Sequence, residues 1–255
     1  HRVDRRQRQM CIRDRYRKDL KIDPDWKGKR VLLDVGGIMY VGDVWLNGKK
    51  VGSNEYGYLG GEYDLTEHLD WGGRNVVAIR ADNTLHSRWY TGGGLYRKVY
   101  LVVKEPVSIA RHGVFVSTPE IAGRQASVKV QVELDNLSGE NRQVTVAVRL
   151  LSPAGKPVAK GNADMQLKGI CATSTIILNV SEPQLWSTET PDLYTAEVTV
   201  KHAGNVLDRI SERFGIRTIE WKPEQGMLLN GKRVKFHGVN AVSYTHLRAH
   251  ETRGN

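Results

Sequence analysis

Residues 128–150 read VKVQVELDNLSGENRQVTVAVRL, and this stretch decides the fold class. Valine or leucine stands at every second position of 128–134 and again of 144–150. Apolar side chains at alternate positions share one face of a β-strand, whereas a helix would need a repeat of about 3.6 residues. Ser138-Gly139 lies between the two runs and is typical of a turn. The stretch therefore predicts two successive strands, each with one buried face.

The same alternation recurs along the chain and is interrupted by turn signals. Further alternating runs lie at 77–81, 99–103 and 196–200. Asn47-Gly48, flanked by apolar residues, is the strongest short signal for a hairpin. No segment keeps an apolar repeat at the helical period for more than a turn or two. Short strands at this spacing predict an all-β protein made of sandwiches.

Composition narrows the class of protein further. The chain has 255 residues, of which 40% are hydrophobic and 26% charged, as is ordinary for a globular protein. It contains no run of about 18 apolar residues, so we expect no transmembrane helix. Two cysteines, Cys11 and Cys171, are too few for the disulfide framework of a small secreted domain. We predict neither a cofactor nor a metal site.

The net charge of +10 is concentrated at the ends of the chain. Residues 1–15 hold six arginines and two aspartates, and residues 241–255 hold two arginines and one glutamate. These ends contribute +4 and +1, which leaves +5 for residues 16–240 without a basic stripe. We therefore predict no nucleic acid and no membrane as partner. The alternative, a basic arm for nucleic acid at residues 1–15, depends on the ends alone.

The sequences at both ends of the chain also differ in character from residues 16–240. RQRQMCIRDR, within residues 1–15, and SYTHLRAHETRGN, within residues 241–255, resemble translated sequencing-adapter read-through, and neither shows strand or helix periodicity. We expect a non-native head at 1–15 and a non-native tail at 241–255, both irregular or weakly packed. The chain would then be a fragment that lacks its native ends.

The remainder divides near Pro106. Residues 16–105 are rich in glycine and aromatic residues, whereas residues 106–219 have few aromatics and much alternating valine. The composition of residues 106–219 is typical of an immunoglobulin-like domain that serves as a spacer. A third piece, residues 220–240, predicts a short hairpin around Asn230-Gly231.

Seven stretches of residues 16–240 carry a resemblance to glycoside hydrolase family 2. They are YRKDLKIDPDWKGKRVLLDVGGIMYVGDVWLNGKKVG, YGYLGGEYDLTEHL, NVVAIRADN, SRWYTGGGLYRKVYL, PQLWSTETPDLYTAEV, FGIRTIEW and LLNGKRVKFHGVN, in the family's order. The resemblance implies an N-terminally truncated jelly-roll, galactose-binding-like sandwich at 16–105 and an immunoglobulin-like sandwich at 106–219. A TIM barrel would begin at 220–240, of which only the first strands are present.

The same resemblance implies a function. Family members are retaining exo-β-glycosidases that hydrolyse terminal β-linked sugars in carbohydrate metabolism, and SRWYTGGGLYR is most like β-galactosidases. Their acid/base and nucleophile glutamates lie on later barrel strands, and a barrel needs about 250 residues. We therefore expect no catalytic residue in this chain and no activity of the chain alone. A carbohydrate is the expected partner, and a homo-oligomer is compatible with the intact enzyme.

Other assignments stay open at this stage. A β-glucuronidase or β-mannosidase of the same family would differ in the barrel. A non-catalytic carbohydrate-binding protein of two sandwiches is a further alternative, although LLNGKRVKFHGVN has no reason to occur there. The resemblance is compatible with a bacterial periplasmic or cytoplasmic protein.

One loop is the candidate for contact with the substrate. In the family, the loop before the GGGLYR-like turn reaches the terminal sugar, and the matching position here is Arg88, flanked by Ser87 and Trp89. A guanidinium offers five fixed donors to sugar hydroxyls, and an indole face can lie against a pyranose ring. The alternative is that Arg88 pairs with a carboxylate at a domain interface and that Trp89 belongs to a core.

Several other patterns have structural interpretations. The glycine run 91–94 lacks the ending and the helix of a phosphate loop, so it predicts a tight turn. His246, His250 and Glu251 have the spacing of helical metal ligands but lie in the foreign tail. We expect Cys171 to be a packed thiol and Trp186 to serve core or interdomain packing. Four scattered aspartates are expected to form turns: Asp34, Asp43, Asp64 and Asp82.

Overall fold

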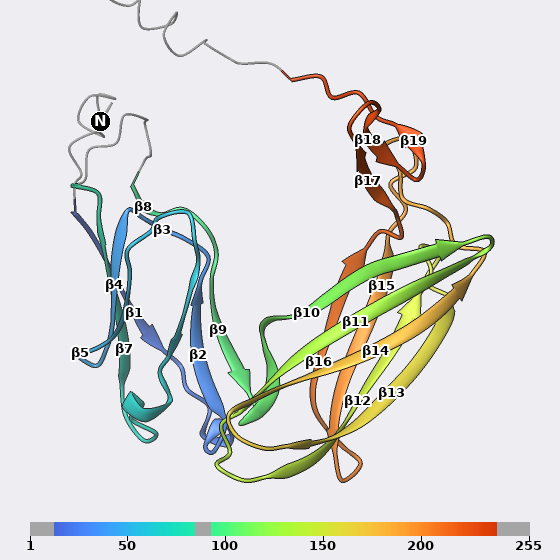
Figure 1. The fold of residues 1–255 in the computed structure, drawn as a ribbon. Helices are drawn as coiled ribbons and strands as arrows, with labels where there is room; N and C mark the ends of the chain where they lie inside the picture. Colours follow the sequence, from blue (N-terminus) through green and yellow to red (C-terminus); the bar gives the residue numbers. More distant parts are fainter. Residues whose placement is uncertain (1–12, 85–92, 239–255) are drawn as a thin grey trace, which may run out of the picture.

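The computed structural model describes residues 13–84 and 93–238, which form two β-sandwiches followed by a small sheet (Figure 1). The two helical elements among these residues are single 3₁₀ turns, Pro24–Trp26 and Thr66–His68. The prediction of an all-β fold is therefore confirmed. In the described residues no sheet closes into a barrel.

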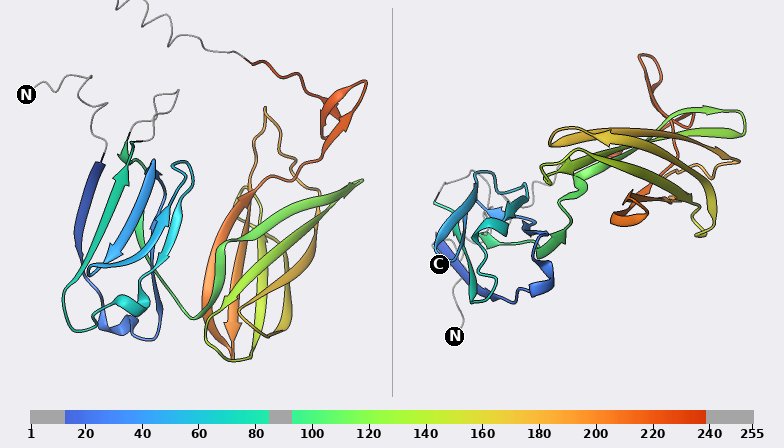
Figure 2. Two further views of the ribbon diagram at one scale, coloured as in Figure 1. Left: turned by 60° about the vertical axis from the view of Figure 1, so that its left-hand side comes forward. Right: turned by 90° about the horizontal axis from the view of Figure 1, so that it is seen from below.

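The first sandwich packs two antiparallel sheets and a short ribbon around one core (Figure 2). The four-stranded sheet has the order β1-β7-β4-β5, the three-stranded sheet β6-β2-β9, and the ribbon pairs β3 with β8. The bounds are β1 Arg13–Leu20, β2 Arg30–Val35, β3 Ile38–Met39, β4 Val41–Leu46, β5 Lys49–Asn54, β6 Gly61–Asp64, β7 Asn75–Asp82, β8 Gly94–Leu95 and β9 Val99–Lys104.

Local sequence explains these strands. Val77, Ile79 and Ala81 of β7 are buried and alternate with less buried neighbours, as period two requires. The β4–β5 hairpin turns at Asn47 and Gly48, whose φ angles are +51° and +82°. Two positive φ angles define the turn that matches the twist of paired strands, so the hairpin prediction is confirmed.

Strand β1 lies at the edge of the first sandwich and begins within the segment predicted as a foreign head. It pairs with β7 over eight residues, from Arg13 opposite Asp82 to Leu20 opposite Asn75. Residues 13–15 are thus part of a regular ladder, contrary to the expected irregularity, because their backbone continues the hydrogen-bonding register set by the residues that follow. The remainder of the head, Cys11 included, and the tail from residue 239 lie outside the described residues.

The second sandwich contains seven strands in sheets of three and four, the arrangement of an immunoglobulin-like domain. The sheets have the orders β10-β11-β14 and β13-β12-β15-β16. Its core includes the alternating residues of 128–134 and 144–150, each at most 1% exposed. The bounds are β10 Val107–Ala122, β11 Gln125–Asn136, β12 Arg142–Leu151, β13 Pro157–Leu167, β14 Cys171–Ser181, β15 Tyr194–His202 and β16 Asn205–Phe214.

Cys171 corrects one expectation, because its thiol is exposed and not packed. It is the first residue of β14, in which Ile176, Leu178 and Val180 face the core. Since side chains alternate between faces, Cys171 shares the outer face with Ile177, which is 62% exposed. Apolar residues occupy both faces of this strand, so its sequence did not reveal which face is buried.

Three short antiparallel strands follow the second sandwich: β17 Ile219–Lys222, β18 Gly226–Leu229 and β19 Lys232–Arg233. The β18–β19 turn has positive φ at Asn230 and Gly231, as the hairpin signal predicted. Strand β17 was not predicted. All three strands pair antiparallel, and no sheet of the described residues closes into a barrel.

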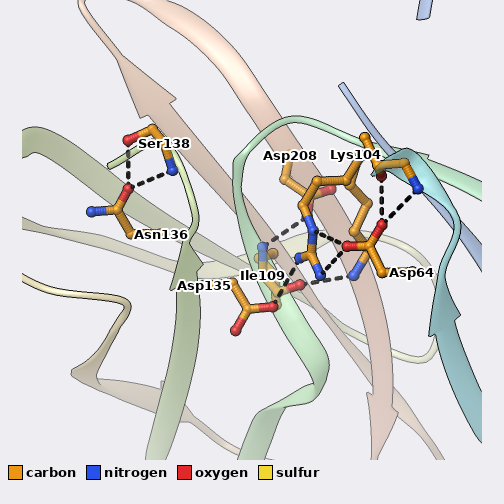
Figure 3. Close-up of polar contacts among 9 residues, drawn as sticks. Asp64, Lys104, Ile109, Asp135, Asn136, Ser138 and Asp208 are labelled. Atoms are coloured by element: carbon orange, nitrogen blue, oxygen red, sulfur yellow. Dashed lines mark hydrogen bonds and ion pairs between the residues drawn. The ribbon is translucent and has the colours of Figure 1, made fainter. Parts of the chain in front are cut away.

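Arginine side chains tie the two sandwiches together. The Arg30 guanidinium, 14% exposed, lies 3.4 Å from Asp64 of the first sandwich and 3.3 Å from Asp135 of the second. Arg111 of β10 reaches back to Asp34 at 2.7 Å and donates to the Gly60 carbonyl. Figure 3 shows the Asp64 and Asp135 carboxylates together with the neighbouring bonds of the Ile109 backbone, which donates to Asp208 and accepts from Lys104.

Candidate functional site

The candidate loop lies between β7, which ends at Asp82, and β8, which begins at Gly94. Strand β8 pairs with β3, and the Asp82 carbonyl at the end of β7 accepts from the Tyr40 amide directly after β3 at 3.2 Å, so both described ends of the loop lie beside β3 (Figure 1). Arg88, Ser87 and Trp89 lie outside the described residues. The geometry of the site therefore comes from the two ends of the loop and from the side chains beside them.

The first end of the loop is held by Asp82. One of its carboxylate oxygens accepts from the Thr84 amide at 3.1 Å, and the other accepts from Arg13 at 3.0 Å. Its pKa is lowered, mainly by the hydrogen bond from the Thr84 side chain, with burial opposing and the Thr84 amide and Arg13 assisting. An aspartate that bonds the amide two residues later forms a turn, so the structural interpretation of Asp82 is confirmed.

The second end of the loop requires glycine. Gly94 has φ +79°, and a Cβ atom placed on it would collide with the Tyr16 hydroxyl. The same hydroxyl accepts a 3.3 Å hydrogen bond from the Leu95 amide, which fixes β8 against β1. Residues 94–98 are strand and loop, so the described part of this run lacks the helix that follows a phosphate loop, and residues 91 and 92 lie outside the described residues.

A cluster of tyrosines lies beside these two ends, and we call Tyr40, Tyr56 and Tyr58 the tyrosine cluster. The rings of Tyr40 and Tyr56 lie 6.5 Å apart and those of Tyr56 and Tyr58 5.7 Å apart, both edge to face. Such geometry is favourable for aromatic pairs. Tyr56 and Tyr58 are nevertheless 49% and 48% exposed, so much of each ring surface remains available to a ligand.

The loop that carries the cluster is fastened to the residues after β8. The Tyr96 hydroxyl donates to the Gly57 carbonyl at 2.7 Å, and Arg97 donates to the Tyr58 and Gly36 carbonyls at 3.5 Å. Sequence reasoning noted that this segment is rich in aromatic residues but did not identify it as a site. The available signal was the sequence Tyr56-Gly57-Tyr58, where glycine permits close approach to Met39.

The other three aspartates expected to form turns, Asp34, Asp43 and Asp64, form ion pairs. The expectation is wrong for Asp34 and Asp43, which lie within strands β2 and β4, whereas Asp64 also accepts from the Thr66 amide at 2.9 Å as a turn former does. Asp34 and Asp64 pair with arginines at the joint described above. Asp43, 6% exposed, lies 2.7 Å from Lys50 and 2.6 Å from Arg80 and also accepts from Ser53. Burial alone would raise the pKa of Asp43, but the hydrogen bonds and charges of these partners outweigh it and lower the pKa. The aspartates are therefore stabilising groups.

The pKa of Asp43 leads to a prediction about stability. A carboxyl whose pKa is lowered on folding contributes stability that is present above its unfolded pKa of about 3.9 and is lost as the pH falls through the folded pKa. We expect Asp43→Asn to reduce the free energy of unfolding by about 1–3 kcal/mol at neutral pH, with a smaller difference below about pH 3. Urea denaturation at both pH values measures this.

The matched control for this prediction is Asp19→Asn. Asp19 also pairs with an arginine, Arg74, but both side chains are mostly exposed, at 62% and 76%. Exposed ion pairs contribute little because water solvates each charge separately. A loss for Asp19→Asn as large as that for Asp43→Asn, or a pH-independent loss for Asp43→Asn, would contradict the assignment.

Trp186 serves packing between the second sandwich and the terminal sheet, as the sequence predicted. Its amide donates to Ile216 at 2.9 Å, and its carbonyl accepts from the Asn230 side chain at 3.0 Å. The Arg217 guanidinium lies 4.7 Å from the centre of the ring and covers one face. The main chain of Trp186 therefore holds the β18–β19 turn to the second sandwich, and its ring packs against Arg217 between them.

The grouping of ligand side chains bears on metal binding, and the length of the helices bears on membrane insertion. Within residues 13–84 and 93–238, no three His, Cys, Asp or Glu side chains gather as metal ligands would. The described residues also include no helix with the length and apolar character needed to cross a membrane. His246, His250 and Glu251 lie outside them.

Two family models match the chain. "Glycosyl hydrolase 2 galactose-binding domain-like" matches residues 5–92, and "Glycosyl hydrolases family 2" matches residues 109–217. A β-galactosidase of Bacteroides ovatus is 35% identical over 227 residues, and a β-glucuronidase of Formosa agariphila is 29% identical over 246 residues. Each alignment covers 88% of this chain, which spans 27% and 25% of the length of those relatives.

Solved structures agree with the family models. A glycosyl hydrolase family 2 member from Bacteroides cellulosilyticus superimposes with a TM-score of 0.85 at 33% identity, covering 89% of this chain and 31% of that one. A β-glucuronidase of Bacteroides uniformis superimposes with a TM-score of 0.81 at 26% identity, covering 89% of this chain and 29% of that one. Two models in consecutive order and these relatives lead to one conclusion. The chain belongs to glycosyl hydrolase family 2.

Proposed function

We propose that this chain provides the two non-catalytic sandwiches of a retaining exo-β-glycosidase, most like a β-galactosidase, that acts on terminal β-linked sugars. The relative with 35% identity is named a β-galactosidase. In this proposal residues 16–105 are the sugar-binding jelly-roll, residues 106–219 the immunoglobulin-like domain and residues 220–240 the start of a TIM barrel. The catalytic carboxylates belong to that barrel.

The carboxyl groups of the described residues support the non-catalytic role. A retaining mechanism needs a nucleophile and an acid that keeps its proton at working pH, so the pKa of that acid must be raised. In the part of the chain that the structure describes, each carboxyl with a shifted pKa has it lowered: Asp19, Asp43, Asp82 and Glu189. Such groups stay ionised and suit ion pairs.

The observation that carries the proposal is the position of the tyrosine cluster beside the two described ends of the candidate loop. The β3–β8 ribbon and the terminal sheet β17–β19 lie toward the same end of the molecule in two views (Figures 1 and 2). A domain that follows β19 on this side would face the described ends of the loop and the half-exposed Tyr56 and Tyr58 rings. Tyrosine rings offer an apolar face to the C–H surface of a sugar and a hydroxyl to its oxygens.

Within this proposal Arg88 contacts the terminal sugar, with Ser87 and Trp89 beside it. Arg88→Ala, in a version of the protein extended by its own barrel, is expected to lower kcat/KM at least tenfold, about 1.4 kcal/mol, without lowering the melting temperature. The reason is that hydrogen bonds to sugar hydroxyls that strengthen in the transition state are lost. Nitrophenyl β-galactoside hydrolysis and thermal unfolding measure the two quantities.

The control for the Arg88 experiment is Arg124→Ala. Arg124 is 83% exposed and pairs with Glu182 in the second sandwich, so its loss should leave both readouts unchanged. Unchanged kinetics of Arg88→Ala with a lowered melting temperature would assign Arg88 to a structural ion pair instead.

A second candidate substrate is a β-glucuronide, because relatives at 29% and 33% identity are named β-glucuronidase and putative β-glucuronidase. The two substrates differ at C6, where a glucuronide carries a carboxylate in place of a hydroxymethyl group, and in the configuration of the C4 hydroxyl. Comparing kcat/KM for nitrophenyl β-galactoside and nitrophenyl β-glucuronide in the extended protein decides between them. A clear preference for the glucuronide would replace the β-galactosidase assignment while leaving the family role intact.

A further inference from the structure

The outer face of the four-stranded sheet in the second sandwich carries a second candidate site. The sheet order is β13-β12-β15-β16, and the strand register places outward side chains in rows across it. One row runs from Lys160 through Arg149 to Glu197. The next row runs from Asn162 through Ala147 and Thr199 to Arg209.

These two rows form a trough of about 560 Å³, lined by side chains of both rows. Its volume falls within the range of small-molecule sites, roughly 300–1,000 Å³. The trough is hollow at Ala147, because this side chain is a single methyl group. The side chains of the adjacent row, Lys160 and Arg149, and Arg209 across the sheet are much longer. The trough lies far from the candidate loop in sequence and belongs to the other sandwich.

The charge of the trough is positive. Arg149, Lys160 and Arg209 contribute three cations, and Glu197 one carboxylate. Arg149 already pairs with Glu197 at 2.7 Å between Nε and Oε2, which holds its guanidinium in place. Neither Lys160 nor Arg209 has a side-chain hydrogen bond or ion pair within the described part of the chain, so both remain available to an anion.

The remaining lining residues suit a saccharide. The Asn162 amide and the Thr199 hydroxyl each donate and accept, as sugar hydroxyls require. Asn162 and Thr199 belong to the row that ends at Arg209. Lys160 lies in the adjacent row, on the same strand as Asn162. A ligand that bonds both the neutral polar side chains and the cations carries hydroxyl groups together with a carboxylate or sulfate.

We propose that this trough binds an acidic saccharide, whose carboxylate or sulfate groups pair with Lys160 at one side of the sheet and with Arg209 at the other. The choice of a saccharide over another anion rests on the proposed function in carbohydrate hydrolysis. The site would hold an acidic polysaccharide near the enzyme and takes no part in bond cleavage. Charge-assisted hydrogen bonds to the two cations supply the affinity and its dependence on salt.

Isothermal titration of the 255-residue chain tests the proposal. The probes are trigalacturonate and a sulfated galactose trisaccharide, with methyl-esterified trigalacturonate as a neutral match. We expect at least one charged probe to bind, the neutral probe to bind at least tenfold more weakly, and Lys160→Gln with Arg209→Gln to weaken the charged probe at least tenfold. Comparison of the two charged probes identifies the anionic group.

The matched control variant carries Lys129→Gln and Lys156→Gln, which remove the same charge from the opposite sheet and from a turn of the same sandwich. Equal weakening by both double variants would show a diffuse charge effect and overturn the site. Equal affinity for inorganic sulfate or for a polyglutamate peptide would overturn the saccharide assignment, as would the absence of binding. Glycosidase activity does not enter this test, so its failure and that of the proposed function are distinguishable.

Discussion

The 255-residue chain is expected to release no nitrophenol from nitrophenyl β-galactoside above a buffer blank. In the proposed role the acid and the nucleophile both belong to the barrel, and loss of both removes most of an acceleration that is at least about 10⁶-fold in enzymes. The same chain extended by its own barrel should turn over the substrate. A continuous assay at high protein concentration measures the difference.

A contaminating glycosidase is the main source of error in that assay. The chain should therefore be purified a second time over an unrelated matrix, and the activity per milligram compared before and after. Activity that follows the protein through both steps at constant specific value would overturn the non-catalytic role. That result would mean that this chain itself contains a pair of catalytic carboxyl groups, and the half-exposed rings of the tyrosine cluster would mark the surface to search for it.

The second large effect concerns the core of the second sandwich. Leu134 of β11 is completely buried and belongs to the cluster between the two sheets. Leu134→Ala removes three carbons from a packed interior and leaves a cavity, and such substitutions cost about 2–5 kcal/mol. We expect a loss of that size in the free energy of unfolding, measured by urea denaturation with an unchanged dependence on denaturant.

Ile177→Ala provides the matched control in the adjacent strand. Ile177 belongs to β14 of the same sheet but is 62% exposed on its outer face. Removing an exposed apolar side chain should change the free energy of unfolding by no more than about 0.5 kcal/mol. If the two substitutions had similar effects, the assignment of inner and outer faces in this sheet would be wrong.

Local sequence was enough for the alternating strands, the two hairpin turns and the order of the family's segments, although not for β17 or for the first residues of β1. Alternating valines require a strand with one buried face, and Asn47-Gly48 and Asn230-Gly231 accept the positive φ angles of tight hairpins. These features depend on residues within a few positions of each other, so no knowledge of distant contacts is needed. The family followed from motifs in their linear order, and both family models confirmed it.

Side-chain contacts between distant segments were decided by the tertiary structure alone. The tyrosine cluster joins Tyr40 to Tyr56 and Tyr58, and Arg30 meets Asp135 from the other sandwich, 105 positions along the chain. Cys171 faces solvent because the register of β14 buries the alternate residues, and a shift of one residue would have reversed this. The basic trough arises in the same way, since only the pairing of four strands places Lys160 and Arg209 around Ala147.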